Sequence, residues 1–146
     1  MINNQKGFTL AESLVVLSIF MILSLVTAIS LKPQHAVLED AAFFTQLKAD
    51  LYYAQNYAIS HQHEVSVVFI PSEYKYYMFL RTEVPPIVER TYSTNINLTV
   101  GTLPFYFKFL QDGNVNKFGS FVIHTQKKDY LLTVLIGKGR FYVTEK

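Results

Sequence analysis

An uncharged stretch near the N-terminus limits what this chain can fold into. From Ser13 to Leu31, nineteen residues include no Asp, Glu, Lys, Arg or His. The wider segment Phe8–Leu31 would rise about 36 Å as an α-helix, more than the roughly 30 Å of a bilayer's hydrocarbon core. It is therefore predicted to span a membrane once. Lys6 precedes it and Lys32 follows it, and from this weak charge asymmetry we infer a cytoplasmic N-terminus.

Two common interpretations of such a segment leave part of it unexplained. A secretory signal peptide has a shorter apolar run, about 7–15 residues, followed by a small-residue cleavage site that this sequence does not offer. A plain membrane anchor accounts for the length but not for Glu12. A carboxylate inside a spanning helix costs roughly 2.5–3.5 kcal/mol, so such a group usually has a partner. Glu12 either has one, or lies near the interface where the helix dipole favours its charge.

The residues around Glu12 resemble a known leader motif. Lys6-Gly7-Phe8-Thr9-Leu10-Ala11-Glu12 is similar to the class III leader of type IV pilins and type II secretion pseudopilins. The resemblance implies that a prepilin peptidase cuts after Gly7 and methylates Phe8. It also implies that Glu12 pairs with the N-terminal amine of a neighbouring subunit, which would offset the desolvation of both charges. Ala11 replaces the larger aliphatic residue usual in the family, and the cleavage expectation stands.

The resemblance and the periodicity together predict an α+β, pilin-like fold in four segments. These are a cleaved leader (1–7), a hydrophobic transmembrane and filament-core helix (8–32), an amphipathic helix (33–60) and a β-rich globular domain (61–146). Pro33 is expected to stop or kink the first helix. In the amphipathic helix, apolar residues recur at helical spacing, so one face should pack on a sheet. The apolar face comprises Phe43, Leu47, Leu51, Ala54 and Ala58, while Glu39, Asp40, Lys48, Asp50 and Gln55 are assigned to other faces.

From Glu64 onward, β-branched and aromatic residues dominate in runs separated by turn residues, which predicts mostly antiparallel sheet. Strands are expected near 64–70, 74–81, 95–100, 105–110, 120–125, 130–136 and 140–144. Turns are expected at Pro71-Ser72, Asp112-Gly113-Asn114 and Gly137-Lys138-Gly139, and a loop at Pro85-Pro86. About 115 residues beyond Leu31 are enough to bury a core without disulfides.

Charge and composition narrow the classes of function. The net charge is +2 and falls to +1 once Met1–Gly7 is removed, so it indicates no particular partner. The chain has no cysteine, which excludes disulfides, thiolate metal sites and a thiol nucleophile. A loose C-terminal basic group is interpreted first as a solvated face and second as a weak DNA contact. It comprises Lys127, Lys128, Lys138 and Arg140, with Lys146.

No enzyme, metal site or cofactor is predicted. Among His35, His61, His63 and His124, only His61-Gln62-His63 has ligand-like spacing, and without a third ligand a solvated loop is the better interpretation. The sequence has no G-x-S-x-G, P-loop or G-x-G-x-x-G motif. Tyr74–Tyr77 and Phe105–Phe109 interleave aromatics with lysine, as single-stranded nucleic-acid platforms do. Alternation of core and exposed faces along a strand explains these segments equally well.

A second, looser resemblance lies in the last third of the chain. The segments FKFLQDGNVNKFGSFVI and LLTVLIGKGRFYV are similar to the closing strands of minor pilins of the pseudopilin-H and FimT type. The first helix, ESLVVLSIFMILSL, together with the chain length and the lack of cysteine, resembles minor pilins of the competence pilus of Gram-positive bacteria.

These resemblances imply a minor pilin of a competence type IV pilus, helping to initiate or cap a filament for DNA uptake during transformation. The implied partners are other major and minor pilins, the prepilin peptidase, the membrane and the membrane-embedded pilus assembly machinery. The subunit would be single-pass in the cell membrane before processing and would then reach the cell surface in a pilus. The alternatives are a type II secretion pseudopilin, a DNA-binding receptor at the pilus tip and, remotely, a membrane-tethered enzyme. Direct DNA binding is the weakest of the partner expectations.

Processing is the first testable expectation. The mature protein should begin at Phe8, carry an N-methyl group and retain the apolar segment, because cleavage lies on the leader side of that segment. Mass spectrometry of the N-terminus, in cells with and without the prepilin peptidase, measures this directly. A mature protein that starts at Met1, or beyond Leu31, would contradict it.

Overall fold

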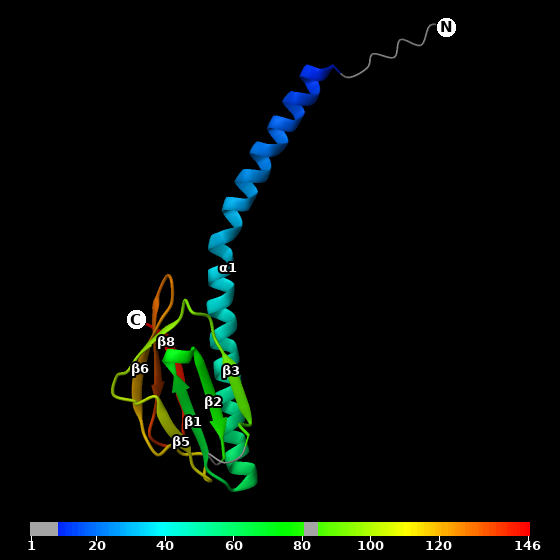
Figure 1. Cartoon of the computed structure of the whole chain (residues 1–146). Helices are drawn as coiled ribbons and strands as arrows, with labels where there is room; N and C mark the ends of the chain where they lie inside the picture. The colour runs from blue at the N-terminus through cyan, green and yellow to red at the C-terminus, as the bar shows by residue number, and fades with distance from the viewer. Residues whose placement is uncertain (1–8, 81–84) are drawn as a thin grey trace. The chain divides into compact units, whose positions relative to one another are not determined.

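In the part of the chain that the structure describes, one long helix leads into a domain of eight short strands. The computed structural model describes residues 9–80 and 85–146. Its chain divides into two units at the Leu38–Glu39 boundary. Helix α1 runs from Leu10 to His61, 52 residues without a break (Figure 1).

Helix α1 continues through Pro33, so the expectation that this proline would stop the helix is wrong. A proline removes one backbone N–H and crowds the carbonyl four residues earlier, which costs roughly 3 kcal/mol inside a helix. That cost can be absorbed where the turns on both sides keep their own hydrogen bonds. Residues 32 and 33 therefore do not separate two helices.

The strands form two antiparallel four-stranded sheets. Sheet A has the order β3-β2-β1-β5, and sheet B has the order β4-β6-β7-β8. Sheet A consists of β1 Val65–Ile70, β2 Lys75–Phe79, β3 Val88–Thr91 and β5 Tyr106–Phe109. Sheet B consists of β4 Asn97–Thr99, β6 Gly119–His124, β7 Asp129–Val134 and β8 Phe141–Glu145. The predicted antiparallel organisation is confirmed, and the strands divide into two sheets.

Strand β3 was not predicted. The sequence analysis assigned a loop at Pro85-Pro86, and β3 begins two residues later, at Val88. It is short, it forms the edge of sheet A, and only Val88 of its four residues is buried. Glu89 and Arg90 at its centre hide the alternation of apolar and polar residues by which strands are recognised. The last residue of the predicted strand 74–81 lies outside the described residues.

The C-terminal half of α1 shares one core with both sheets. All five residues of the predicted apolar face, Phe43, Leu47, Leu51, Ala54 and Ala58, are buried. Phe44 contacts sheet B through Tyr130 of β7, with ring centroids 4.4 Å apart. Phe69 of β1 lies 5.1 Å from Phe121 of β6, so the inner faces of the two sheets also meet.

The expected turn at Gly137-Lys138-Gly139 is present and joins β7 to β8. Gly139 has φ +56°, and a Cβ there would lie 2.2 Å from the carbonyl oxygen of Gly113. Gln55 of α1 links this turn to the turn at Asp112-Gly113-Asn114, because its Nε2 donates to the carbonyls of Gly113 and Lys138, both at 2.8 Å. Glycine is therefore required at position 139, where two turns and the helix come together.

The domain should fold without the first part of the helix. A chain starting at Pro33 keeps both sheets and all the α1 residues that are buried in the described part of the helix, so we expect it to be soluble and folded. Circular dichroism in detergent-free buffer, with a cooperative thermal transition, would measure this. An unfolded spectrum would contradict the assignment of the core to residues 39–146.

Candidate assembly site

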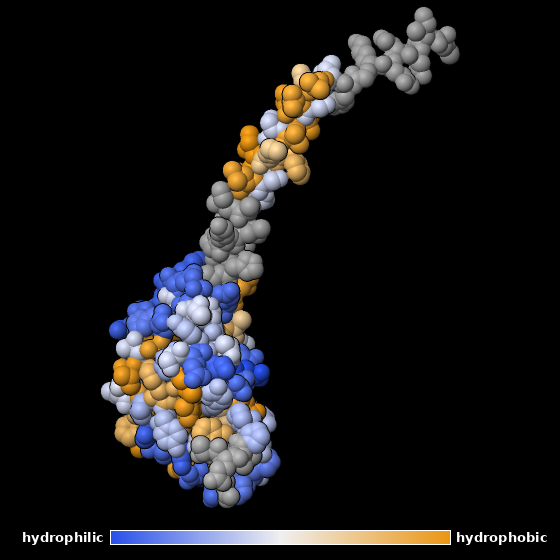
Figure 2. All heavy atoms as spheres, in the orientation of Figure 1, coloured by the Kyte–Doolittle hydropathy of each residue, from blue (hydrophilic) through white to orange (hydrophobic). Residues whose placement is uncertain are grey.

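The first part of α1, Leu10–Thr27, presents apolar side chains outward. Leu10–Thr27 is the one helical segment of the described residues that is long and apolar enough to cross a membrane. Its exposed apolar side chains include Leu10 at 82% and Phe20 at 67% exposure. On the visible face of this segment in Figure 2, orange hydrophobic residues predominate, with paler residues between them. A surface of this kind must be covered by lipid or by other protein.

Glu12 caps the start of this helix together with Thr9. The backbone N–H of Thr9 donates to Glu12 Oε2 at 2.9 Å, and the Thr9 hydroxyl donates to the same oxygen at 3.0 Å. In return, the N–H of Glu12 donates to Thr9 Oγ1 at 3.3 Å. This reciprocal arrangement is a capping box, which supplies partners for backbone N–H groups that a helix leaves unpaired in its first turn.

Sequence reasoning singled out Glu12 and missed Thr9. The signal was available, because Thr9-Leu10-Ala11-Glu12 has the S/T-x-x-E spacing of a capping box. Both Thr9 hydrogen bonds end on a single carboxylate oxygen. A carboxylate can accept further donors, so the cap and an amine of another subunit are compatible. The predicted cleavage residues, Gly7 and Phe8, lie outside the described residues.

Asp50 is a buried acid between α1 and sheet A. Its side chain is only 7% exposed, and three residues donate to it. Tyr76 Oη lies 2.8 Å from Oδ2, Arg90 Nε lies 3.1 Å from the same oxygen, and Gln46 Nε2 lies 2.9 Å from Oδ1. Burial raises the pKa of Tyr76, and the hydrogen bond to Asp50 raises it further, so this phenol stays protonated and donates to the carboxylate. Hydrogen bonding to Asp50 also raises the pKa of Arg90.

The assignment of Asp50 to a polar face of the helix is wrong. Asp50 lies seven residues after Phe43 and four before Ala54, so helical spacing puts it on the buried face. Its burial is tolerated because donors from α1, β2 and β3 satisfy the carboxylate. Removing one partner of such a buried pair is strongly destabilising.

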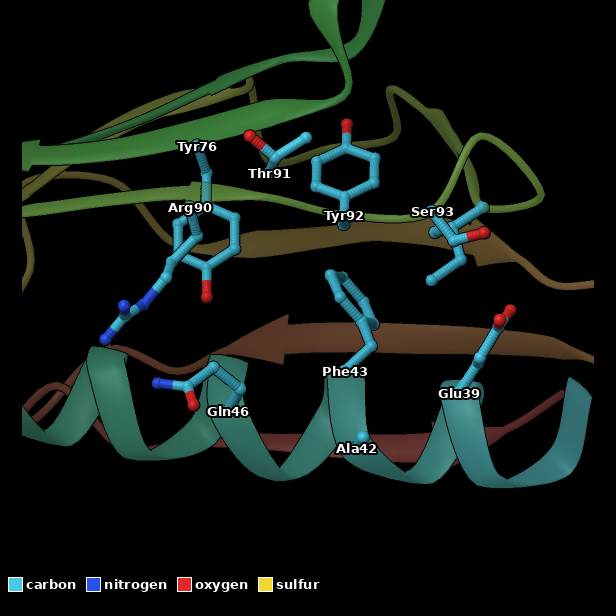
Figure 3. A pocket seen from close by; sticks show the side chains of 10 residues that line it. Glu39, Ala42, Phe43, Gln46, Tyr76, Arg90, Thr91, Tyr92 and Ser93 are labelled. Atoms are coloured by element: carbon cyan, nitrogen blue, oxygen red, sulfur yellow. The ribbon is translucent and has the colours of Figure 1, made fainter. Parts of the chain in front are cut away.

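A cavity of about 400 Å³ opens beside this cluster. Phe43 and Gln46 on α1 and Tyr76 and Arg90 on sheet A point into it in Figure 3. Tyr92 also lines it, and burial raises the pKa of Tyr92 to about 12. Glu39, Thr91 and Ser93 also belong to its described lining.

The structure does not bring the four basic residues into one patch. Lys127 and Lys128 lie in the turn between β6 and β7, whereas Lys138 and Arg140 lie between β7 and β8. The six residues of β7 separate the two pairs by roughly 20 Å. Lys128 Nζ lies 2.8 Å from the Glu145 carboxylate, and that hydrogen bond raises the pKa of Lys128.

His61 and the two aromatic segments take part in ring stacking, core packing and ion pairs within the domain. His61 stacks on Tyr57 at 3.9 Å between ring centroids. Among the side chains that the structure describes, those of residues 9–27, 37–80 and 85–146, no three from His, Asp or Glu come together as a metal site would need. Tyr76, Phe107 and Phe109 are core residues, and the interleaved lysines face carboxylates, Lys75 with Glu89 and Lys108 with Glu64. The strand-alternation interpretation of these segments is confirmed.

Comparison with known proteins adds three findings. Residues 2–28 match the family described as the prokaryotic N-terminal methylation motif. Competence protein ComGD of Bacillus subtilis (strain 168) is 32% identical over 145 residues, covering 99% of this chain and 97% of ComGD. Two solved structures share the fold, which confirms the expected fold class. The first is the type IV minor pilin FimU of Pseudomonas aeruginosa, with a TM-score of 0.58 and 14% identity over 68% of this chain and 84% of FimU. The second is the minor pseudopilin EpsH of the Vibrio cholerae Type 2 Secretion System, with a TM-score of 0.56 and 11% identity over 73% of this chain and 97% of EpsH.

The Asp50 cluster yields a stability prediction. Tyr76→Phe in the chain starting at Pro33 removes one donor from a buried carboxylate, so we expect a loss of about 1.5–3 kcal/mol in the free energy of unfolding. The matched control is Tyr142→Phe on the exposed side of β8, expected to change stability by less than about 0.5 kcal/mol.

The same pair of variants has a predicted pH dependence, measurable by urea denaturation. Because the folded pKa of Tyr76 is raised, its contribution is fully present below the unfolded value of about 10 and is lost as the pH rises above it. The difference between wild type and Tyr76→Phe should therefore shrink above pH 10. Equal stabilities at pH 7 would show that the hydrogen bond to Asp50 adds nothing net.

Proposed function

This chain belongs to the family of type IV pilins and pseudopilins, and on that premise we propose that it helps to initiate or cap a competence filament used in DNA uptake. It is a ComGD-like minor pilin, a structural protein and not an enzyme. The observation that carries the proposal is the similarity to ComGD, which extends over nearly the whole of both chains. A match confined to the helix would have supported only a shared mode of membrane insertion and processing.

We propose that the subunit is inserted in the membrane before it joins the filament. Leu10–Thr27 would be held in the bilayer, with the N-terminus on the cytoplasmic side, until the prepilin peptidase cuts after Gly7 and methylates Phe8. The exposed apolar face of this segment supports the proposal, because lipid and neighbouring helices can both cover it. The assembly machinery would then transfer the subunit from the membrane to a pilus on the cell surface.

We propose that Glu12 selects the position of the subunit in the filament. In the isolated chain its carboxylate is held by Thr9 at the start of α1. Cleavage would create an amine at Phe8, and in a bundle of pilin helices the amine of a neighbouring subunit is a partner of opposite charge. A carboxylate left unpaired in such a bundle is costly, so this pairing favours one register over others.

The two alternatives receive less support. A secretion pseudopilin would move protein cargo, and the likeness to EpsH bears only on the fold at 11% identity. A DNA receptor at the tip needs a continuous basic surface, whereas Lys127 and Lys128 lie at the opposite end of β7 from Lys138 and Arg140.

The test compares Glu12→Gln and Glu12→Ala in a strain that lacks the chromosomal copy. Glutamine is the neutral residue that a capping box accepts at this position, so Glu12→Gln keeps the cap and removes only the charge. We expect both variants to be cleaved normally and to reach wild-type levels in the membrane, since losing a charge makes the helix easier to hold there. Both should be depleted from sheared pili, and transformation should fall towards that of the deletion strain.

Ser18→Ala is the matched control, because the Ser18 hydroxyl bonds only within its own helix, to the carbonyl of Val15. It should be processed, assembled and active. Normal piliation and DNA uptake with Glu12→Gln would show that the charge has no part in assembly. A deletion strain that transforms normally but fails to secrete proteins would replace the competence proposal with the pseudopilin alternative.

A further inference from the structure

The cavity beside the Asp50 cluster is not used by the proposed assembly of the filament. Its volume of about 400 Å³ lies within the range of roughly 300–1,000 Å³ that small-molecule sites occupy. Buried aromatic rings form its base, and exposed polar side chains border it (Figure 3). We propose that this cavity binds an uncharged pyranose ring, either as a free sugar or within a longer glycan, and we call it the sugar cleft.

The base of the sugar cleft is a set of fixed aromatic rings. Phe43 on α1 and Tyr92, directly after β3, lie 5.4 Å apart between ring centroids with their planes at 61°. The Tyr76 ring lies 6.5 Å from the Tyr92 ring at 21°. All three residues are buried, so neighbouring side chains hold them in place. A pyranose ring presents a face of C–H groups, and an aromatic base offers such a face an apolar surface to pack on.

Polar side chains border this base from both sides. Glu39 and Gln46 come from α1, whereas Arg90, Thr91 and Ser93 come from β3 and the residues after it. Figure 3 shows Glu39 directed from the helix towards Ser93 across the cleft. The border therefore offers a carboxylate, an amide, a guanidinium and two hydroxyls, which include both donors and acceptors. Sugar hydroxyls also donate and accept, so a ligand with several of them matches this mixed border.

The Asp50 carboxylate orders part of the border before a ligand arrives. Gln46 Nε2 donates to Asp50 Oδ1 at 2.9 Å, and Arg90 donates to the same carboxylate from Nε at 3.1 Å and from Nη2 at 3.5 Å. These bonds leave the Gln46 carbonyl oxygen and further Arg90 N–H groups available to a ligand. Ser93 Oγ accepts from the backbone N–H of Asn95 at 3.3 Å. Groups that are already held lose little freedom on binding, which favours affinity.

The charges of the cleft select an uncharged ligand. The Arg90 charge is balanced by Asp50 at 3.1 Å, and Glu39 adds one negative charge at the border. This excess disfavours phosphates and carboxylates, and with them nucleic acids. An ammonium ligand can only donate, and it would meet Arg90 as a like charge. A neutral polyhydroxyl compound avoids both conflicts and still uses the whole border.

The test is a titration of the full-length protein, kept in a polyoxyethylene detergent because that headgroup carries no sugar. The chain has no tryptophan, so its tyrosine fluorescence reports on Tyr76 and Tyr92 in the cleft. The neutral probes are glucose, galactose, N-acetylglucosamine, cellobiose, lactose and diacetylchitobiose. Glucose 6-phosphate and glucosamine are their anionic and cationic counterparts. Sedimentation with insoluble cellulose and chitin separates the two sources, because retention that a soluble sugar releases assigns a ring within a glycan, and binding of soluble sugars without retention assigns a free sugar.

Two variants locate the binding. Ala42→Phe fills the cleft with a large ring, and Glu39→Ala removes the carboxylate from its border. Ala41→Phe is the matched control, since Ala41 is the exposed neighbour of Ala42 and lies outside the described lining. All three positions are exposed, so the thermal transition measured by circular dichroism should stay at the wild-type temperature.

We expect at least one neutral sugar to give a saturable change with a dissociation constant in the low millimolar range or tighter. Ala42→Phe and Glu39→Ala should each weaken it by at least about tenfold, the effect of losing one good contact, while Ala41→Phe leaves it unchanged. No saturable change with any neutral sugar would overturn the inference, as would affinity that both cleft variants retain. Tighter binding of glucose 6-phosphate or glucosamine than of glucose would overturn the uncharged ligand. None of these results alters the proposed role in the filament, which the Glu12 variants test separately.

Discussion

Burial of one side of α1 against the two sheets is the interaction on which the domain depends. Leu47, Leu51, Ala54 and Ala58 are fully buried, and the alanines let the helix approach the inner faces of both sheets closely. The two sheets also meet each other directly, as where the Phe69 ring lies 5.1 Å from the Phe121 ring. Without the helix, each sheet would expose most of its inner apolar face, so neither forms a stable unit alone.

The Asp50 cluster fixes the position of α1 along sheet A, which apolar packing alone would not do. Hydrophobic contact alone is tolerant of small shifts along a helix, whereas a carboxylate that must meet Tyr76, Arg90 and Gln46 together is not. Two of these donors come from neighbouring strands of sheet A, and the third comes from the helix itself. The buried charge therefore selects one register of helix on sheet, and slipping by a turn would leave it unsatisfied.

The sequence analysis succeeded where a single local pattern decides the structure. The helical spacing from Phe43 to Ala58 predicted the buried face, and turn residues located the β7–β8 hairpin. It failed where tertiary partners decide. Asp50 could be judged buried only by trusting spacing over polarity, and its donors on β2 and β3 are not visible in sequence. Strand β3 gains its place from pairing with β2, and α1 continues past Pro33 despite the proline. The Thr9–Glu12 cap was readable but was overlooked in favour of the leader motif.

Asp50 and Glu12, two acidic residues of α1, differ in how their carboxylates are paired. Asp50 is satisfied within one subunit by three donors, and nothing further is needed to keep it buried. Among the described residues, Glu12 is held by Thr9, in a segment whose apolar surroundings penalise charge. The C-terminal half of α1 shows the same contrast, because Leu47 and Leu51 are buried against the sheets while Tyr52 and Tyr53 are half exposed. Groups whose partners all lie within the chain specify the fold. Apolar or charged groups that stay exposed require neighbouring subunits to cover them.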